Sequence, residues 1–431
     1  MIVQGTVRVP GDKSISHRAL FVAALVRRGK SEIRGLLPGE DVKSTARVLR
    51  QLGIGVSSIR GAGEAVAAVT VAAARLSPPG SRLHCGNSGT TARLALGLLA
   101  GQRFAATLTG DASLRRRPMR RVTEPLRLMG ARIAESPTGT LPLTIRGGGL
   151  TPIAYSSPVA SAQVKSAILL AGLSGGVPVT IKEPYRSRDH TERLFVHLGL
   201  DLHQTNSTVS YQPSAVSLKA FNLTVPGDIS SAAFLVAAGV LAEGGELLIE
   251  QVGVNPTRTG FLAVLERMGA HVERVNLGAE GGEPVADLLV RPAPRIQGTE
   301  VAAAEIPTLV DEVPVLAVVA SRASGDTVFR EVGELRVKES NRLEAIAANL
   351  RTVGAAAEVR GNDLHVSGGG APPRGRVDTE RDHRLAMAFA VLGTLPGAAV
   401  RLSERRSVRI SYPNFFADLR RISGTDARHR D

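Results

Sequence analysis

The sequence predicts an α/β fold in two similar halves, in which buried helices are covered by outer sheets. The first support is a helix stop that recurs along the chain, two apolar residues three positions apart followed by glycine. A glycine after the last turn is typical of the left-handed position that ends a helix. The copies, the last with serine in place of glycine, are Leu49–Gly53, Leu126–Gly130, Phe195–Gly199, Leu265–Gly269, Leu350–Gly354 and Leu419–Ser423. They lie 69 to 85 residues apart, which indicates six similar units, each too long for a short solenoid repeat.

A second repeat groups these units into halves. The sequence VPGDKS at Val9–Ser14 returns 216 residues later as VPGDIS at Val225–Ser230, almost half the chain length away. Because two domains suit a chain of 431 residues, we predict one domain at 13–227 and a second formed by 1–12 plus 228–431. The N-terminal strand is then expected to cross into the second domain. A cleft between the two would be a favoured ligand site.

Two stretches predict where the helices lie. Residues 232–242, AAFLVAAGVLA, and residues 167–173, AILLAGL, are apolar on every face of a helix. A helix of this kind must be buried all round. If each unit contains one such helix, the helices form the interior and the sheets lie outside, the reverse of a TIM barrel.

Composition excludes several classes of protein. A single cysteine, Cys85, rules out an internal disulfide and is typical of a reducing cytoplasm. No apolar run reaches the ~20 residues of a membrane span, and the first residues lack the apolar core of a signal peptide. We therefore expect a cytoplasmic protein that has no membrane partner.

The net charge of +14 has two interpretations, nucleic-acid binding and the attraction of small anions into a cleft. We favour small anions, because the basic residues are spread along the chain and aromatic residues make up only 3% of it. The cations are 46 arginines and seven lysines, so Lys13 and Lys338 draw attention. Lysine is a compact, titratable charge that arginine does not replace at a catalytic phosphate.

Three polar clusters open the first half. Gly11–Arg18 is a turn entering a helix expected to continue through Val26, with Lys13 and Ser14 at the helix N-terminus, where an anion is favoured. Gly86–Arg93 again places small and hydroxyl residues before a helix, and Leu114–Arg121 is a dense cationic loop. Each of these taken alone is as well explained by a capped helix or a solvated charge run.

Further clusters follow in both halves. Hydroxyl, amide and arginine side chains precede expected helices at Ser161–Ser166 and Ser187–Glu192, and acidic residues stand among cations at Asp311–Glu312, Arg336–Arg342 and Asp382–Arg384. Acids among cations suit general acid–base chemistry on an anionic substrate. The histidines lack the spacing of metal ligands, and neither GxxxxGK(S/T) nor GxGxxG is present, so we expect no metal and no nucleotide.

Taken together and in this order, the motifs resemble the 5-enolpyruvylshikimate-3-phosphate synthase family of enolpyruvyl transferases, over nearly the whole chain. The matching segments are PGDKSISHRA, GNSGTTAR, RRRPM, SAQVKSAILLAGL, SRDHTERL, DEVPVLA, RVKESNRL and DHRLAM. The resemblance implies a two-domain inside-out α/β barrel, each domain made of three βαβαββ units. It also implies transfer of enolpyruvyl from phosphoenolpyruvate to the 5-hydroxyl of shikimate 3-phosphate, releasing phosphate, with no cofactor and with the active site in the interdomain cleft.

The same resemblance assigns residues to the two substrates. The N-terminal half is expected to serve mainly shikimate 3-phosphate, and the C-terminal half mainly phosphoenolpyruvate and catalysis. The residues expected at shikimate 3-phosphate are Lys13, Ser14, Arg18, Ser161, Ala162, Gln163, Arg188, Asp311 and Lys338. Those expected at phosphoenolpyruvate are Lys13, Gly89, Arg117, Gln163, Arg342 and Arg384, with Asn87 and Thr90 shaping the loop.

The resemblance implies a catalytic set of Lys13, Asp311, Glu339 and His383. We favour Asp311 as the base for the hydroxyl and Glu339 as the acid and base at the methylene carbon, with Lys13 as the competing acid. His383 would support the site from beside Arg384. Since the residues come from both halves, catalysis is expected to require domain closure.

Two departures from the family pattern concern ligand contacts. Ile410 stands where some members place a lysine, so that phosphate contact is either missing or moved to Arg409. Ala162 and Glu334 replace polar residues found in other members. Gly89 is retained, which looks like the glyphosate-sensitive arrangement, so we expect glyphosate to compete with substrate. We expect a monomer.

The nearest alternative is UDP-N-acetylglucosamine enolpyruvyl transferase, which shares the fold. That family places a cysteine in the loop corresponding to Asp111–Pro118, and this loop has none. Cys85 lies before the second cluster and cannot replace it. The alternative from a different class is a basic nucleic-acid binder, whose binding would depend steeply on salt.

Overall fold

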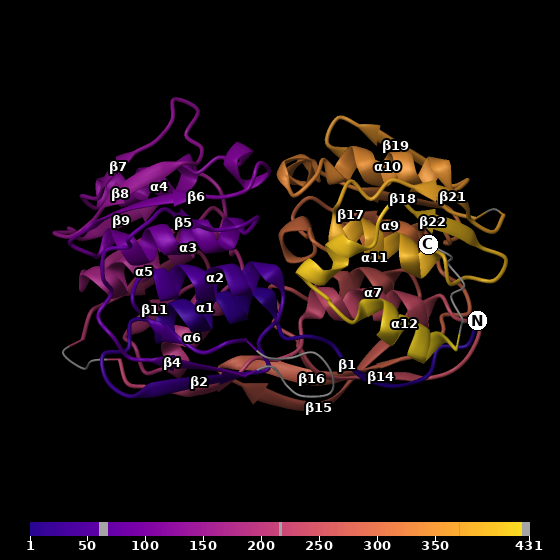
Figure 1. Cartoon of the computed structure of the whole chain (residues 1–431). Helices are drawn as coiled ribbons and strands as arrows, with labels where there is room; N and C mark the ends of the chain where they lie inside the picture. The colour runs from indigo at the N-terminus through magenta and orange to yellow at the C-terminus, as the bar shows by residue number, and fades with distance from the viewer. Residues whose placement is uncertain (60–67, 215–217, 370, 425–431) are drawn as a thin grey trace. The chain divides into compact units, whose positions relative to one another are not determined.

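The computed structural model describes residues 1–59, 68–214, 218–369 and 371–424. The chain divides into two compact units (Figure 1). The N-terminal unit consists of Gly11–Pro226 with Ala279–Glu283, and the C-terminal unit of Met1–Pro10, Gly227–Gly278 and Pro284–Asp431. Every described helix falls short of the length and apolar character that a membrane span requires.

The N-terminal unit has three four-stranded sheets. Their orders are β13-β2-β4-β3, β5-β6-β8-β7 and β9-β10-β12-β11. The helices are α1 Lys13–Ala23, α2 Glu40–Gln51, α3 Gly89–Ala100, α4 Arg120–Leu128, α5 Ala162–Gly175 and α6 His190–His197, and a short 3₁₀ helix, η1, covers Leu114–Arg116. The strands are β2 Lys30–Arg34, β3 Gly55–Val56, β4 Ala68–Ala72, β5 Leu83–His84, β6 Ala105–Thr109, β7 Arg132–Ala134, β8 Leu143–Arg146, β9 Ile153–Ser156, β10 Val179–Lys182, β11 Leu202–Gln204, β12 Thr208–Tyr211 and β13 Asn222–Thr224.

The C-terminal unit has the sheets β1-β14-β16-β15 and β17-β18-β20-β19 and the two-stranded sheet β21-β22. The helices are α7 Ile229–Val240, α8 Gly260–Arg267, α9 Val313–Ala320, α10 Arg342–Thr352, α11 His383–Leu392 and α12 Phe415–Ser423, with 3₁₀ helices η2 Ile306–Thr308, η3 Gly333–Val337 and η4 Arg406–Ile410. The strands are β1 Gly5–Arg8, β14 Leu247–Gly253, β15 Val272–Glu280, β16 Glu283–Val290, β17 Glu300–Val301, β18 Asp326–Phe329, β19 Ala356–Arg360, β20 Asp363–Ser367, β21 Arg374–Val377 and β22 Ala399–Leu402.

The sheets repeat one pattern. Each four-stranded sheet starts with a parallel pair, and its second strand then pairs antiparallel with a third. The sixth unit keeps only the parallel pair β21–β22, after which the described chain continues into α12. Among the described residues, the predicted βαβαββ unit is complete in five copies, and the sixth copy is described as far as α12.

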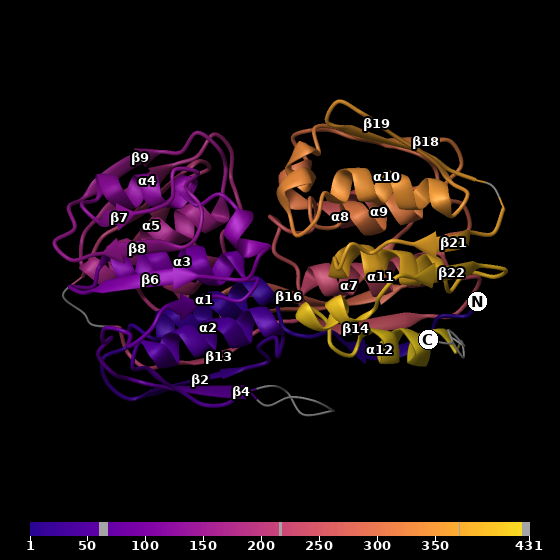
Figure 2. The same ribbon diagram turned by 45° about the horizontal axis from the view of Figure 1, so that its top comes forward.

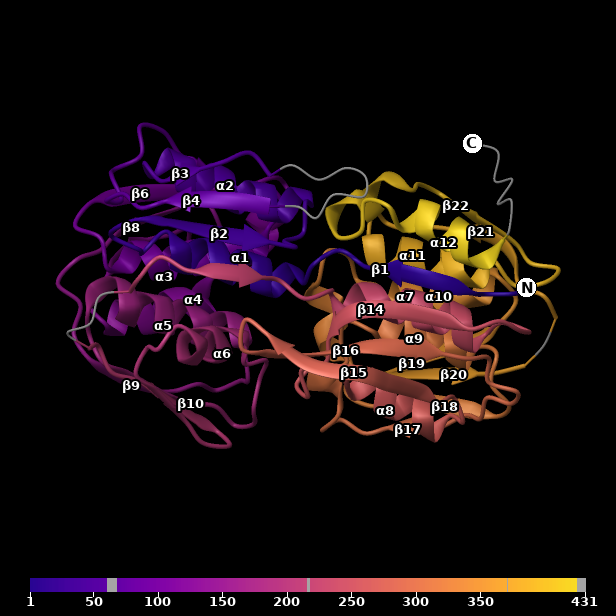
Figure 3. The same cartoon turned by 90° about the horizontal axis from the view of Figure 1, so that it is seen from below.

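The predicted crossing of the N-terminal strand is confirmed. Strand β1 pairs in parallel with β14, with Gly5 opposite Leu247 and Val7 opposite Ile249. In the other unit β13 occupies the matching position beside β2. Figure 3 shows β1 alongside β14. The repeated VPGD sequence thus follows a strand exchanged between the two units.

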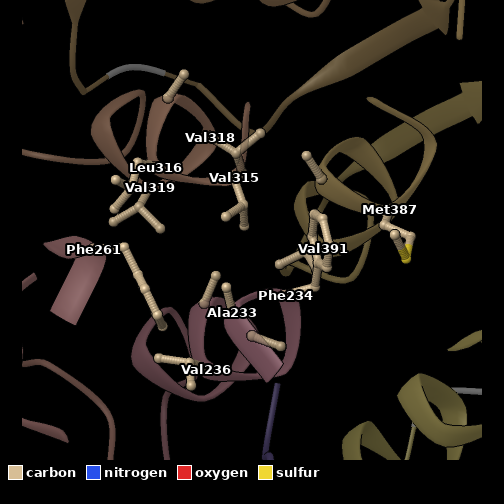
Figure 4. Close-up of a cluster of buried hydrophobic side chains, with 14 of the residues drawn as sticks. Ala233, Phe234, Val236, Phe261, Val315, Leu316, Val318, Val319, Met387 and Val391 are labelled. Carbon is tan, nitrogen blue, oxygen red and sulfur yellow. The ribbon is translucent and has the colours of Figure 1, made fainter. Parts of the chain in front are cut away.

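Helices form the interior of each unit, as predicted. Every residue of α7 and α9 is buried, and both helices pack against α11. Figure 4 shows Phe234 of α7, Val315 of α9 and Val391 of α11 in one apolar cluster. In the N-terminal unit α3 packs along α5 and also against α1. Outer strands lie against these helices, for example β6 against α3 and β18 against α9 (Figure 2).

The helix stops have a common geometry. The glycine after each of five helices has a positive φ between 72° and 104°. At the first stop the Ile54 N–H donates to the Leu49 carbonyl at 3.0 Å and the Gly53 N–H to the Arg50 carbonyl at 3.0 Å, the pattern of a Schellman motif. At the sixth stop Ser423 is still helical, and Gly424 takes the left-handed conformation with φ 58°.

Helix α1 is shorter than predicted. It ends at Ala23, and the chain to Val26 continues as a tighter turn in which Leu25 N–H bonds to Val22 and Val26 N–H bonds to Ala23. These bonds span three residues, as in a 3₁₀ turn. An apolar sequence alone does not distinguish this turn from another helical one.

Candidate active site

The predicted residues of the N-terminal unit gather at three helix N-termini. Lys13, Gly89 and Ala162 are the first residues of α1, α3 and α5. Each helix is capped by the side chain before it, since Asp12, Ser88 and Ser161 each accept from the backbone N–H three residues further along the chain. Unpaired N–H groups and the helix dipole favour anions at such ends.

Arg18 joins the first and third of these ends. Its Nε donates to Thr191 Oγ1 at 2.7 Å, and Nη2 donates to Ser166 Oγ at 2.8 Å. Nη1 bonds to the Ser14 carbonyl at 3.0 Å, and Nη2 reaches the Ala162 carbonyl at 3.5 Å. Burial lowers the pKa of Arg18 to about 10, against the opposing effect of nearby carboxylates, so the side chain is still cationic at neutral pH. A cation is thereby fixed between Ser14 and Ala162.

Arg188 lies close enough to Arg18 for their charges to interact. The Arg188 guanidinium contributes to the lowered pKa of Arg18, behind the larger effect of burial. Like charges held near each other favour binding of an anion, which relieves their repulsion. The pair therefore suits a phosphate dianion.

Lys13 has an acidic neighbour that the sequence did not reveal. Its Nζ lies 3.3 Å from Asp41 Oδ2, and both side chains keep some exposure to solvent. Asp41 is at the start of α2, far from Lys13 in sequence. The ammonium group is thus held in position while remaining accessible to a ligand.

Two guanidinium groups flank the start of α3. A Cβ placed on Gly89 would lie 3.1 Å from Arg93 Nη1 and 3.5 Å from Arg117 Nη1. Arg117 is held by Asn87, whose Oδ1 accepts from Nη2 at 2.7 Å. Arg93 donates to Gln163 Oε1 at 2.5 Å, and Gln163 Nε2 donates to Thr90 Oγ1 at 3.0 Å. These contacts connect the second motif with the fourth, and a Cβ at position 89 would be tight against Arg93 and in ordinary contact with Arg117.

In the C-terminal unit the central cation is Arg342, the first residue of α10 and only 1% exposed. Its Nε lies 2.7 Å from Asp382 Oδ2, Nη2 lies 2.5 Å from Glu339 Oε2, and Nη1 lies 3.6 Å from Asp311 Oδ1. Burial alone would lower the pKa of Arg342, but these carboxylates outweigh it and raise the pKa. Conversely, burial would raise the pKa of Asp382, but Arg342 holds it low. Both groups are therefore charged at neutral pH.

Arg384 is bound from two sides. Its Nη1 donates to the Asp311 carbonyl at 2.9 Å, and Nη2 lies 3.7 Å from Asp311 Oδ2. Glu312 lies 3.6 Å from Nη1 and also accepts a hydrogen bond from Ser230. Arg258 donates to the same Ser230 hydroxyl at 2.6 Å, so a buried polar network supports Arg384 from the interior of the unit.

Two acids of this cluster are partly accessible. The side chains of Asp311 and Glu339 are 14% and 24% exposed, whereas Asp382 is fully buried. Accessible carboxylates beside buried cations suit proton transfer on an anionic substrate. His383 is buried at the start of α11. Lys338 pairs with Glu334 at 2.8 Å, which links one of the departures from the family pattern to a predicted site residue.

Within each unit the predicted residues come together, and their principal partners were missed. The missed partners are Asp41, Arg93, Glu312 and Asp382. Arg93, Glu312 and Asp382 belong to motifs that the sequence shows, but the motifs alone do not indicate which side chains these residues contact. Arg409, to which the contact of the absent lysine is moved in one of the two alternatives above, is exposed at η4.

Comparison with known proteins identifies the family. The profile of EPSP synthase (3-phosphoshikimate 1-carboxyvinyltransferase) matches residues 2–419. The chain is 44% identical to the 3-phosphoshikimate 1-carboxyvinyltransferase of Geobacillus kaustophilus over 430 residues, covering 97% of this chain and 98% of that one. It is 48% identical to the protein of the same name from Gloeobacter violaceus, covering 97% and 96% of the two chains.

Solved structures give the same result. EPSP synthase from Acinetobacter baumannii superimposes with a TM-score of 0.86 at 37% identity, covering 98% of this chain and 96% of that one. The enolpyruvyl transferase NikO from Streptomyces tendae has a TM-score of 0.73 at 19% identity, covering 98% and 95%. The second likeness shows a shared fold only.

Proposed function

This chain belongs to the EPSP synthase family. We propose that each of its two side-chain clusters binds mainly one of the two substrates of that enzyme. As a 3-phosphoshikimate 1-carboxyvinyltransferase, it transfers the enolpyruvyl group of phosphoenolpyruvate to shikimate 3-phosphate in the shikimate pathway, which leads to aromatic amino acids. In our proposal the cluster around Arg18 binds shikimate 3-phosphate, and the cluster around Arg342 binds phosphoenolpyruvate and carries out catalysis. Gly89 and Arg117 of the N-terminal unit also serve phosphoenolpyruvate.

The observation that most supports this assignment is the meeting of motifs that are distant in sequence. Arg18 of the first motif contacts Ala162 and Ser166 of the fourth, and Gln163 contacts Thr90 and Arg93 of the second. Both substrates carry phosphate and carboxylate groups. Clustered cations at helix N-termini match that chemistry.

The proposed mechanism gives each acid one proton transfer. Glu339 protonates the methylene carbon of phosphoenolpyruvate, which makes the adjacent carbon cationic. The 5-hydroxyl of shikimate 3-phosphate attacks that carbon while Asp311 accepts the hydroxyl proton. Glu339 then recovers a proton from the new methyl group as the phosphate leaves. Lys13 is the alternative acid for the first step, and His383 supports Arg384. We propose that the units close on the substrates during the reaction.

Substrate choice tests the function directly. Phosphate release from phosphoenolpyruvate is expected with shikimate 3-phosphate and not with UDP-N-acetylglucosamine. Turnover with the nucleotide sugar alone would overturn the assignment. The structure gives a reason to expect the first result, because burial raises the pKa of the Cys85 thiol to about 12 and makes it unsuitable as a reactive group.

We also propose that glyphosate competes with phosphoenolpyruvate at the guanidinium pair beside Gly89. Gly89→Ala places a methyl group 3.1 Å from Arg93 Nη1, so this guanidinium must shift. We expect the KM for phosphoenolpyruvate and the glyphosate inhibition constant each to rise by a few-fold up to about tenfold, because a displacement of about 1 Å has effects up to ~100-fold and Arg93 need move less than that. Steady-state kinetics with increasing glyphosate measures both.

The matched control is Gly80→Ala, because a Cβ on Gly80 would meet nothing within 4 Å. It should leave both constants unchanged. If Gly89→Ala is inhibited by glyphosate as strongly as wild type, glyphosate does not bind beside Gly89.

We further propose that the protein is cytoplasmic and monomeric. The expected result of analytical ultracentrifugation is a mass equal to one chain.

A further inference from the structure

A buried ion cluster lies behind the N-terminus of α5, and the mechanism above does not use it. Lys165 is 1% exposed, and its Nζ is 2.7 Å from both Glu183 Oε2 and Glu192 Oε1. The two carboxylates are also buried. Carboxylate charges outweigh burial and raise the pKa of Lys165, so Lys165 is cationic, while burial raises the pKa of Glu192 against the opposing effect of Lys165. Since buried charges are costly, such a cluster is weak evidence for stability and invites another explanation.

Glu183 connects two segments expected to bind shikimate 3-phosphate. Its Oε1 accepts from the backbone N–H of Ser161 at 2.9 Å, and both oxygens accept from the Ser187 hydroxyl at 2.8 and 2.9 Å. Oε2 also accepts from the Ser187 N–H at 3.3 Å. Ser161 caps α5, and Ser187 immediately precedes Arg188. One carboxylate therefore fixes the distance between the α5 N-terminus and the Arg188 segment.

The other end of the cluster borders Arg18. Glu192 follows Thr191, which accepts from Arg18 Nε, and the Glu192 charge is the main effect opposing the lowered pKa of Arg18. Ser166, next to Lys165, accepts from Arg18 Nη2 and bonds to the Ala162 carbonyl at 2.5 Å. The positive charges of Lys165 and Arg18 are matched by Glu183 and Glu192.

We infer that Glu183, held by Lys165, is a positioning residue that keeps Ser161 and Arg188 at the spacing required by the phosphate of shikimate 3-phosphate. This inference rests on the proposed function. Without the carboxylate, the N–H groups of Ser161 and Ser187 and the Lys165 ammonium all lose an acceptor. The two segments are then free to separate, while the residues expected at phosphoenolpyruvate keep their own contacts with Asn87 and Thr90.

The test is Glu183→Gln, which keeps the side-chain shape and one acceptor oxygen but puts an NH₂ group in place of the other oxygen, against donors that need an acceptor. We expect the KM for shikimate 3-phosphate to rise about 10- to 100-fold, with the KM for phosphoenolpyruvate changing less than about threefold. Calorimetric binding of shikimate 3-phosphate without the second substrate should weaken by the same factor. Ser187→Ala, which removes only the hydroxyl bonds to Glu183, is the milder variant should Glu183→Gln not fold, and should raise the same KM by a few-fold.

The matched control is Glu135→Gln in the same unit. Glu135 is largely buried and pairs with Arg127 and Thr123, which are not among the expected substrate residues. The Glu135→Gln variant should therefore leave both KM values unchanged even if its melting temperature falls. An unchanged KM for shikimate 3-phosphate in the Glu183 and Ser187 variants would overturn the inference, as would equal rises for both substrates. Failure of the proposed function would be seen separately, as a wild-type enzyme that does not turn over shikimate 3-phosphate.

Discussion

Glu339→Gln is expected to lower kcat by a factor of about 10² to 10⁴, the usual contribution of a positioned acid or base. The change removes the ionisable proton but keeps the shape and one carbonyl oxygen, which still accepts from Arg342 Nη2 across the present 2.5 Å. Arg342 also keeps Asp382 as its main partner. The melting temperature should therefore change little, and single-turnover phosphate release should isolate the lost chemical step.

Glu344→Gln is the matched control for this prediction. Glu344 lies on α10, the helix that begins with Arg342, but its carboxylate is half exposed and pairs with Arg336. Its replacement should leave kcat unchanged. If Glu339→Gln retains kcat within a few-fold of wild type, the carbon proton must come from another group, and Lys13 becomes the acid to test.

The fold was predictable because its repeated signals are local. A left-handed glycine and the apolar residues around it lie within six consecutive positions, so the Schellman stops at Gly53 and its four equivalents are visible in the sequence. The geometry of the sixth stop was not predictable in this way. Its sequence resembles the others, but Ser423 is still helical and Gly424, one position later, takes the left-handed conformation.

The site was predictable in its residue types but not in its pairings. The helix N-termini that carry Lys13, Gly89 and Ala162 follow from small and hydroxyl residues before apolar runs. The partner of a charged side chain is set by packing between distant segments, as the 40-residue separation of Arg342 and Asp382 illustrates. Lys165 could have been found, because it is a single cation within a helix that is otherwise apolar towards its C-terminus.

Asp382→Asn should cause a large loss of stability, because it removes the main counter-charge of a buried guanidinium. Breaking one side of a buried pair typically costs 3–5 kcal/mol. We expect a loss of about 3 kcal/mol, at the low end of this range, because Glu339 and Asp311 stay near Arg342. The helix cap is not the cause, since asparagine can still accept from the Arg384 N–H at the present 2.9 Å. Urea unfolding gives the difference in free energy.

The pH dependence of this difference in unfolding free energy shows whether Asp382 stabilises the unit through its charge or through its packing. Arg342 holds the pKa of Asp382 below its usual range although burial acts in the opposite direction, so the contribution of Asp382 is complete above about pH 4 and is lost as the pH falls through its folded-state value. The free-energy gap between wild type and Asp382→Asn should therefore narrow below about pH 4. Asp363→Asn, at a pair with Arg330 that is more exposed, should cost no more than about 1 kcal/mol at neutral pH. A gap that stays constant down to the acid transition would show that Asp382 stabilises the unit through its shape and hydrogen bonds instead of its charge.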